Sequence, residues 1–342
     1  MVYHSQKPCH CKPYVSQIIL AVRNLDSLLV ANNKGFIRYN YSMKVTVKPG
    51  KYVLAVSGGM DSMVLLDLLS RQSGLDVVVA HFDHGIRSDS EEDRRLVEAA
   101  AARYGLPFVT ARGELGANAS EAAARQARYA FLRQVMADYH ADAIITAHHQ
   151  DDRLETAIIN MIRGTGRKGL DALTSRPGVL RPLLHVTKND LYEYARRQKQ
   201  RGRPVLWRED STNASDAYLR NYIRHHVTGK LNSTQRRAFI ARVARAHELN
   251  AEIDELLLAE TRGTASGGLN RYRFIMLPYA VSCEVMAAWL RQHNVRQFDR
   301  RTIGRLVIAA KVAFPGKTLH INTGYLLEVG RRELHITPDV PS

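Results

Sequence analysis

The apolar positions of the chain predict buried strands that alternate with helices. Four short runs have the continuous apolar, β-branched pattern of strands buried on both faces, and they cover residues 53–56, 76–82, 106–110 and 143–147. Each run is followed by a segment with helical periodicity, over residues 63–69, 91–104, 120–132 and a stretch that ends at residue 162. This alternation predicts an α/β fold, a parallel sheet with helices on both faces.

The pattern changes in the last third of the chain. Helical periodicity runs from about residue 232 through Glu260, and a small α+β module follows a Gly-containing linker at 262–268. Its expected helices cover residues 281–291 and 301–312, and its expected strands cover residues 319–322 and 325–329. We therefore expect an extension outside the fold at 1–42, a catalytic domain at 43–228, and a helical and small α+β region at 229–342. We also expect translation to start at Met43, directly before the first strand.

The first buried strand leads into a glycine-containing turn, Ser57-Gly58-Gly59-Met60-Asp61-Ser62. A strand, a Gly-rich turn and a helix in this order direct backbone N–H groups towards an anion at the helix N-terminus. The Asp61 carboxylate is compatible with phosphates if Mg²⁺ lies between them. The structural alternative is that Asp61 or Ser62 merely caps the helix. The spacing of a Walker loop is absent, so the turn predicts a different kind of phosphate loop.

Polar side chains also follow the second and fourth strands, where the carboxyl ends of a parallel sheet carry ligand sites. His81, Asp83, His84 and Arg87 come at the end of the second strand and predict the rim of a ligand site.

A pair of acids lies at the start of the helix after the fourth strand. Asp152 and Glu155 are three residues apart and share one helical face. They either grip an ammonium group or a metal, or they are simply favoured by the helix dipole. Arg125 and Arg128 also share a helical face. They either pair with surface acids or neutralise charge on a transferred phosphate.

The composition of the chain indicates a polyanionic binding partner. The formal net charge is +16 over 342 residues, and residues 181–250 alone hold 15 Lys or Arg against 6 Asp or Glu. Such an excess favours nucleic-acid binding. No apolar run reaches the length of a membrane span, and three cysteines fit a reducing compartment rather than a disulfide scaffold. We therefore expect a cytoplasmic protein that does not enter a membrane.

Several motifs together resemble one family. The phosphate loop at 57–62, His81 to Arg87, Glu121 to Tyr129, His148 to Thr156, Arg181 to Leu184, Lys188 and Glu209 to Arg224 are similar, in this order, to the motifs of the tRNA(Ile)-lysidine synthetases. These enzymes belong to the N-type ATP pyrophosphatases, or PP-loop superfamily. The resemblance covers residues 50–228 and is weaker in the C-terminal third, which is short compared with longer members.

The resemblance implies a tRNA-modifying ligase with ATP and Mg²⁺ as cofactors. It implies that the C2 oxygen of the wobble cytidine in a CAU-anticodon tRNA(Ile) is adenylated with release of pyrophosphate, and that the ε-amine of free L-lysine then displaces AMP. A homodimer is compatible with the sequence. The implied site residues are Ser57, Gly58, Gly59, Met60, Asp61, Ser62 and His84 for ATP, with Asp61 also for Mg²⁺; Arg125 or Arg128 for the α-phosphate; Asp152 and Glu155 for lysine; and Arg181, Lys188, Arg220, Asn221 and Arg224 for tRNA.

Two other functions stay open at this point. A tRNA 2-thiolation enzyme of the same superfamily needs cysteines for sulfur or an iron–sulfur cluster, and residues 43–282 contain none. An RNA-binding protein with a relict ATP site would be expected to lose Gly or Asp from its loop, whereas this loop keeps both. Release of pyrophosphate in the presence of ATP and tRNA separates the relict protein from the enzyme.

Overall fold

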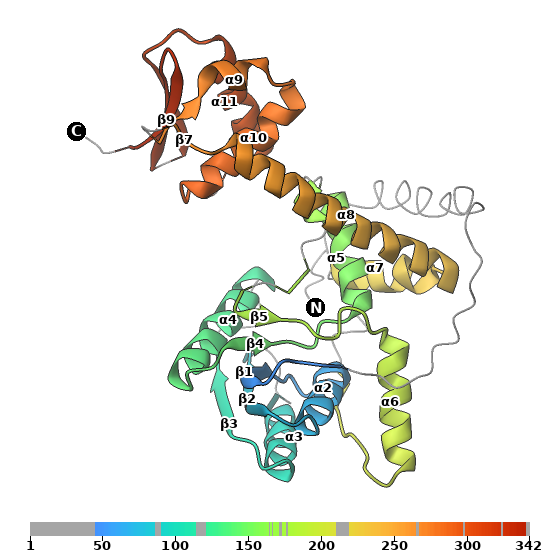
Figure 1. Ribbon diagram of the computed structural model, residues 1–342. Helices are drawn as coiled ribbons and strands as arrows, with labels where there is room; N and C mark the ends of the chain where they lie inside the picture. The colour runs from blue at the N-terminus through green and yellow to red at the C-terminus, as the bar shows by residue number, and fades with distance from the viewer. Residues whose placement is uncertain are drawn as a thin grey trace, which may run out of the picture. The chain divides into compact units, whose positions relative to one another are not determined.

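The computed structural model describes residues 45–339, apart from gaps at 86–89, 114–120, 164, 166, 171–172, 176, 210–218, 265–266, 297 and 323 (Figure 1). The predicted extension at 1–42 and Arg87 lie outside the described residues. The chain forms two compact units, which divide between Ala246 and His247. This division falls inside a helix, downstream of residue 228, and the domain boundary that we expected there stays a prediction.

The first unit is built on a parallel sheet of five strands in the order β3-β2-β1-β4-β5. Its strands are β1 (Gly50–Ala55), β2 (Leu75–Asp83), β3 (Phe108–Arg112), β4 (Ala143–Ile145) and β5 (Val179–Leu180). All four strands predicted from apolar runs are present. The fifth was not predicted, because a strand of two residues is too short to show any periodicity.

Helices cover both faces of this sheet, as predicted (Figure 1). The helices of the unit are α2 (Met60–Ser70), α3 (Ser90–Arg103), α4 (Glu121–Asp138), α5 (Gln150–Ile162), α6 (Lys188–Gln200) and α7 (Leu219–His226), with 3₁₀ turns at Arg167–Gly169 and Thr228–Lys230. Alternate residues of one strand face opposite cores: Val53 packs with α4, and Leu54 packs with α2, α3 and α6. Burial on both faces explains why the strands read as continuous apolar runs.

The strand order places a ligand crevice at a defined point. The chain passes from β1 outward to β2 and β3, and then returns to add β4 on the other side of β1. Connections on either side of this reversal leave the sheet in opposite directions, and the gap between them lies at the carboxyl ends of β1 and β4. The phosphate loop follows β1, and the acidic start of α5 follows β4. The topology therefore brings these two predicted motifs to one edge of the sheet.

The second unit has its own core and an antiparallel sheet in the order β6-β9-β8-β7. Helix α8 (Ser233–Glu260) leads into it, and its further elements are β6 (Leu269–Asn270), α9 (Arg271–Met276), α10 (Tyr279–Gln292), α11 (Arg300–Val312), β7 (Lys317–Asn322), β8 (Tyr325–Val329) and β9 (Glu333–Pro338). The two helices and two strands predicted for this α+β module are present. Within the described residues, no helix is both long and apolar enough to cross a membrane.

Candidate active site

A pocket of about 480 Å³ opens at the carboxyl ends of β1, β2 and β4. Six segments of the first unit contribute to its wall: the end of β1 with the phosphate loop, the end of β2, the start of α3, helix α4, the residues after β4 with the start of α5, and Arg208 after α6. The polar side chains on the wall are Ser57, Asp61, Ser62, His81, Asp83, His84, Ser90, Asp93, Arg128, Thr146, His148, Asp152 and Arg208.

The phosphate loop has the backbone geometry that its glycines suggested. Gly58 has φ +90°, a conformation that residues with a Cβ rarely adopt, and an added Cβ would lie 3.3 Å from the Cβ of Asp93. Gly59 is the N-cap of α2, and no side chain caps this helix end. The Ser62 hydroxyl donates to the Gly59 carbonyl at 2.9 Å and so holds the turn from within. The alternative in which Asp61 or Ser62 simply caps the helix is therefore not the arrangement seen, and the positive end of α2 faces the pocket.

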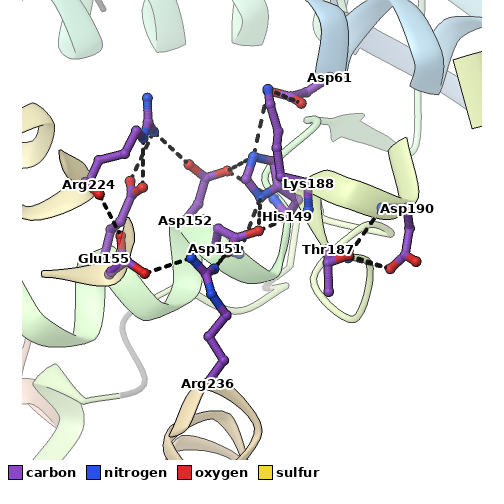
Figure 2. A network of polar contacts seen from close by, with 11 residues as sticks. Asp61, His149, Asp151, Asp152, Glu155, Thr187, Lys188, Asp190, Arg224 and Arg236 are labelled. Carbon is purple, nitrogen blue, oxygen red and sulfur yellow. Dashed lines mark hydrogen bonds and ion pairs between the residues drawn. The ribbon is translucent and has the colours of Figure 1, made fainter. Parts of the chain in front are cut away.

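Asp61 is held by two basic side chains from other elements (Figure 2). The Lys188 ammonium at the start of α6 donates to Asp61 at 2.6 Å, and His149 Nε2 lies 3.6 Å from the other carboxylate oxygen. Burial favours the neutral acid, but the hydrogen bonds and charges of His149 and Lys188 outweigh it and hold the pKa of Asp61 below its usual value. Asp61 is therefore an anion in this site.

Asp152 serves both the start of α5 and the pocket. His149 is the N-cap of this helix, and its backbone N–H donates to the Asp152 carboxylate at 3.0 Å. Asp152 also lines the pocket, so the helix-terminus explanation for this acid holds without excluding a ligand.

Glu155, one turn further along α5, is bound by an arginine. It is 1% exposed, and Arg224 of α7 donates to its two oxygens at 2.8 and 3.0 Å. Burial raises the pKa of Glu155, and the Arg224 guanidinium opposes that shift. Arg224 also lies 3.8 Å from Asp152 (Figure 2). The structure thus pairs a residue predicted to hold lysine with one predicted to hold tRNA, and the acids at this edge of the pocket already face cations.

The two arginines of α4 differ in their position. Arg128 lines the pocket, and Arg125 is not part of its wall. Both guanidinium groups lie over the ring of Tyr129, at 4.9 Å for Arg125 and 5.7 Å for Arg128. The geometry therefore favours Arg128 as the α4 residue that faces a bound anion. His84, predicted for ATP, also lines the pocket, and burial lowers its pKa.

The residues predicted to bind tRNA do not form one exposed surface. Arg181 is 4% exposed and Asn221 is 8% exposed, and the Arg181 guanidinium donates to the Thr174 carbonyl. Arg220 donates to the Thr156 hydroxyl at 3.4 Å. The Lys188 ammonium lies 2.6 Å from Asp61 of the phosphate loop, and its side chain is 38% exposed. The roles of these residues in RNA binding stay predictions.

Arg208 is a pocket residue that the sequence did not indicate. Its backbone N–H donates to the Gly58 carbonyl at 3.1 Å, and its Nε lies 3.5 Å from Asp93. It therefore holds the phosphate loop against α3. No local pattern could have revealed this, because Arg208 follows α6 and is far from the loop in sequence.

The side chains fit a magnesium ion that is shared with phosphates. Among the described residues, no three His, Cys, Asp or Glu side chains gather closely enough to hold a metal by themselves. Mg²⁺ in nucleotide sites usually takes one or two protein carboxylates and completes its shell with phosphate oxygens and water. The ionised Asp61 at the phosphate loop provides such a carboxylate.

Comparison with known proteins identifies the family of the first unit. The sequence model of the PP-loop domain matches residues 33–231, and its start lies inside the segment that we expected outside the fold. The tRNA(Ile)-lysidine synthase of Thermus thermophilus is 44% identical over 182 residues, which are 51% of this chain and 34% of that protein. That of Geobacter sulfurreducens is 39% identical over 228 residues, or 62% of this chain and 46% of that protein. That of Thermotoga maritima is 36% identical over 274 residues, or 76% of this chain and 63% of that protein.

The chain thus spans about a third to two thirds of the length of these curated relatives. Among solved structures, the U34-tRNA thiolase of Methanococcus maripaludis is similar with a TM-score of 0.48 and 15% identity, over 72% of this chain and 85% of that one. The family match covers more than half of the chain and includes the phosphate loop and all five strands of the parallel sheet. The chain belongs to the PP-loop domain family.

Proposed function

We propose that the chain is a tRNA(Ile)-lysidine synthetase. In the proposed reaction, the C2 oxygen of the wobble cytidine of a CAU-anticodon tRNA(Ile) attacks the α-phosphate of ATP and pyrophosphate leaves. The ε-amine of lysine then attacks C2 and AMP leaves, which gives lysidine and changes codon reading from AUG to AUA. The names of the curated relatives support this choice of substrate.

The observation that carries the proposal is that one pocket contains the groups needed by both half-reactions. The phosphate loop, Arg128 and Asp152 line the same hollow, so a phosphate, a base and an amine can meet there. Adenylation turns a poor leaving oxygen into a good one, because AMP leaves in its place. The cytidine can enter only as an unstacked base, the form that a single-stranded RNA loop presents.

In the first half-reaction, the loop at 57–62 binds the pyrophosphate through backbone N–H groups and the hydroxyls of Ser57 and Ser62. Bound Mg²⁺ would neutralise phosphate charge beside Asp61. Arg128 stabilises the charge that develops at the α-phosphate. We also assign Lys188 to the phosphates and no longer to tRNA, because its ammonium lies 2.6 Å from Asp61.

In the second half-reaction, Asp152 is the acid that we expect to bind the lysine ammonium. It lines the pocket, whereas both oxygens of Glu155 are engaged by Arg224. The ε-amine of free lysine has a pKa of about 10.4 and must lose a proton before it attacks. A nearby carboxylate binds the ammonium form and accepts that proton as the bond to C2 forms.

The test is mass spectrometry of the wobble nucleoside after the protein is incubated with tRNA(Ile), ATP and lysine. Lysidine at the wobble position supports the proposal, and unmodified cytidine under conditions where the protein binds both ATP and tRNA contradicts it. A thiolated nucleoside would favour the alternative enzyme, and ATP left intact would favour a relict site.

The half-reactions can be separated with variants of the two acids. Asp152→Asn is expected to raise the KM for lysine by about 10–150-fold, the equivalent of a lost charge-assisted hydrogen bond, while adenylated tRNA still forms without lysine. Glu155→Gln is the comparison variant, because it removes the charge of the other acid and with it the ion pair between Glu155 and Arg224. Failure of a folded Asp152→Asn variant to adenylate tRNA would move Asp152 to the ATP or metal site.

A further inference from the structure

Asp151 in the first turn of α5 connects the starts of two other helices (Figure 2). One of its carboxylate oxygens accepts from the backbone N–H of Lys188, the first residue of α6, at 2.9 Å. The other oxygen accepts from the guanidinium of Arg236 in the first turn of α8. The Asp151 side chain is 14% exposed, so one partly buried carboxylate links segments that lie 37 and 85 residues away in the sequence.

The contact with α6 holds the residue that reaches the phosphate loop. A backbone N–H in the first turn of a helix has no acceptor within the helix, and Asp151 supplies one for Lys188. At its other end, Lys188 donates from Nζ to Asp61 at 2.6 Å. Asp61 lines the pocket and the Lys188 side chain is 38% exposed, so this side chain lies beside the pocket without being buried. A shift of Asp151 would move the backbone from which the ammonium extends.

Asp151 also contacts the second basic neighbour of Asp61. Its backbone N–H donates to Nδ1 of His149 at 3.2 Å, and Nε2 of that ring lies 3.6 Å from Asp61. The start of α5 is bonded to the segment before α6 as well, since the N–H of Gln150 donates to the Val186 carbonyl at 2.9 Å. Asp151 is thus part of the contacts that fix both basic side chains around Asp61.

The guanidinium of Arg236 is itself held in one orientation. It donates from Nη2 to the Thr228 carbonyl at 2.6 Å as well as to Asp151, and a planar guanidinium with two acceptors has little freedom to turn. Charge-assisted hydrogen bonds are stronger than bonds between neutral groups, so the arginine fixes the carboxylate firmly. Neither Asp151 nor Arg236 belongs to the pocket wall, so the pair acts on the site without touching a ligand.

A purely structural role for this pair is the alternative. An acid in the first turn of α5 is favoured by the helix dipole, and an ion pair between two helices contributes to stability. In that case, loss of the pair lowers the stability of the fold and leaves the contact between Lys188 and a phosphate unchanged. The two roles therefore differ in whether the effect of Arg236 on ligand binding depends on Lys188.

We propose that Asp151 and Arg236 are positioning residues that hold Lys188 where its ammonium binds the phosphates of ATP. The carboxylate fixes the start of α6, and the guanidinium fixes the carboxylate. This inference rests on the proposed use of ATP and adds two residues, from α5 and α8, that act through Lys188. Neither residue takes part in the transfer of the adenylyl group.

The first test is a double-mutant cycle in the full-length chain. Binding of ATP with Mg²⁺ is measured by calorimetry, without tRNA, for the wild type, Arg236→Gln, Lys188→Met and the double variant. Arg236→Gln alone should bind ATP about tenfold more weakly, because the charge-assisted contact from Lys188 loses its geometry. In the Lys188→Met background, the same change should weaken binding by less than about twofold. Equal losses in the two backgrounds would contradict the inference, as would unchanged affinity in Arg236→Gln.

Matched variants separate position from charge and from folding. Arg236→Lys keeps the charge without the planar fork and should recover part of the affinity. Asp151→Asn keeps an acceptor for the Lys188 N–H but breaks the ion pair, and it should also weaken ATP binding. Arg237→Gln removes an exposed arginine at the next position of α8 and should bind ATP like the wild type. A loss in Arg237→Gln as large as in Arg236→Gln would attribute the effect to net charge and reject the inference.

The outcomes also separate this inference from the proposed function. If Arg236→Gln does not fold, Asp151→Asn takes its place in the cycle. ATP binding with the expected dependence on Lys188 but no lysidine product would keep the positioning roles and reject the lysidine synthetase. Lysidine product with equal losses in the two backgrounds would keep the enzyme and reject the positioning roles. A wild-type protein that binds no ATP would reject both.

Discussion

Lys188 shows how the position of one side chain changes a functional assignment. The sequence placed it with the tRNA contacts, whereas its ammonium lies 2.6 Å from the Asp61 carboxylate. Lysine binds phosphate as a compact point charge with three donors. A lysine beside a phosphate loop therefore moves from one anion, Asp61, to another with little rearrangement.

Lys188→Met should lower the rate of pyrophosphate release by about 10–150-fold, because a charge-assisted contact to phosphate is lost. The affinity for tRNA should change by no more than a few-fold. Lys188→Arg is the matched control, which keeps the charge with a different geometry and should retain part of the activity. A large loss of tRNA affinity with normal pyrophosphate release would restore the RNA assignment.

His148 should make the stability of the folded chain depend on pH. Like Asp152 it lines the pocket, its Nδ1 lies 2.8 Å from the Thr146 hydroxyl, and burial lowers its pKa to about 3. The unfolded chain takes up a proton near pH 6.5, whereas the folded chain does not until about pH 3. Stability should therefore fall as the pH drops below 6.5, by up to about 1.4 kcal/mol per pH unit from this group.

The measurement is the free energy of unfolding between pH 7 and pH 4 for the wild type and for His148→Asn, which can keep the contact with Thr146. The variant should lose less stability than the wild type over this range, because it has no proton to take up when it unfolds. Parallel pH profiles would show that His148 titrates alike in both states.

At the scale of elements, a buried carboxylate ties α6 to α2. Asp67 of α2 is 1% exposed and accepts from Tyr104 and Tyr194, each at 2.6 Å, and from two nitrogens of Arg71 at 2.7 and 3.0 Å. Burial raises the pKa of Asp67, but these donors outweigh it and hold the pKa below the usual value. Because α6 carries Tyr194 in its middle and Lys188 at its start, this network fixes the helix that brings Lys188 to Asp61.

Asp67→Asn should lower the free energy of unfolding by about 2–4 kcal/mol, because it leaves buried donors facing an amide. Tyr194→Phe should cost only about 1 kcal/mol, since it removes one donor and leaves the carboxylate bound by the others. Urea denaturation of the two variants checks the ranking. An Asp67→Asn variant as stable as Tyr194→Phe would show that the charge of Asp67 adds nothing.

At the scale of the whole molecule, each unit has a hydrophobic core of its own. In the second unit the largest buried side chains include Trp289 and Phe274. Arg271 is 6% exposed there, and its guanidinium donates to the carbonyls of Ala310, Ala313 and Gly330 at 2.5–2.9 Å. Two of these carbonyls, of Ala310 and Ala313, lie at the C-terminal end of α11, where helix carbonyls have no partner within the helix. Arg271 thereby supplies their donors.

Arg271→Met should destabilise the second unit by about 2–4 kcal/mol, since buried carbonyls lose their donors, and leave ATP binding by the first unit unchanged. Arg273→Met is the control: this arginine is 68% exposed and pairs with Glu260 at 3.3 Å, so its loss should cost less than about 1 kcal/mol. Calorimetric melting, with ATP added to mark the first unit, measures both. Loss of ATP binding in Arg271→Met would show that the units do not unfold separately.

The charge of the whole chain predicts salt-dependent binding of tRNA. Arg220→Ala and Arg224→Ala should each reduce the slope of log K against log salt by roughly one unit if each side chain contacts one phosphate. Arg196→Ala is the matched control, because Arg196 is an exposed arginine of α6 that pairs with Glu193. Slopes unchanged in both variants would place the RNA surface elsewhere.

Features that are local in the chain could be predicted from the amino-acid sequence. Strands β1, β2 and β4 contain buried residues on both faces of the sheet, so their apolar runs are visible without a structure. Strand β3 lies at the edge of the sheet and is only partly buried, but its apolar run was also visible. The phosphate loop is one continuous strand, turn and helix. The elements that were missed are short, as β5 is, or lie in polar stretches, as α6 and α7 do. Their positions depend on packing against neighbours, which periodicity does not record.

Contacts between side chains that are distant in sequence became visible only in the folded chain. Lys188 contacts Asp61, and Arg224 contacts Glu155, across separations of 127 and 69 residues. The bond from His81 to the Val56 carbonyl joins the end of β2 to the residue that follows β1. Contacts of this kind depend on the order of strands in the sheet and on the directions of the helices between them. The energies that set that order come from the whole core, and therefore no motif in the sequence specifies them.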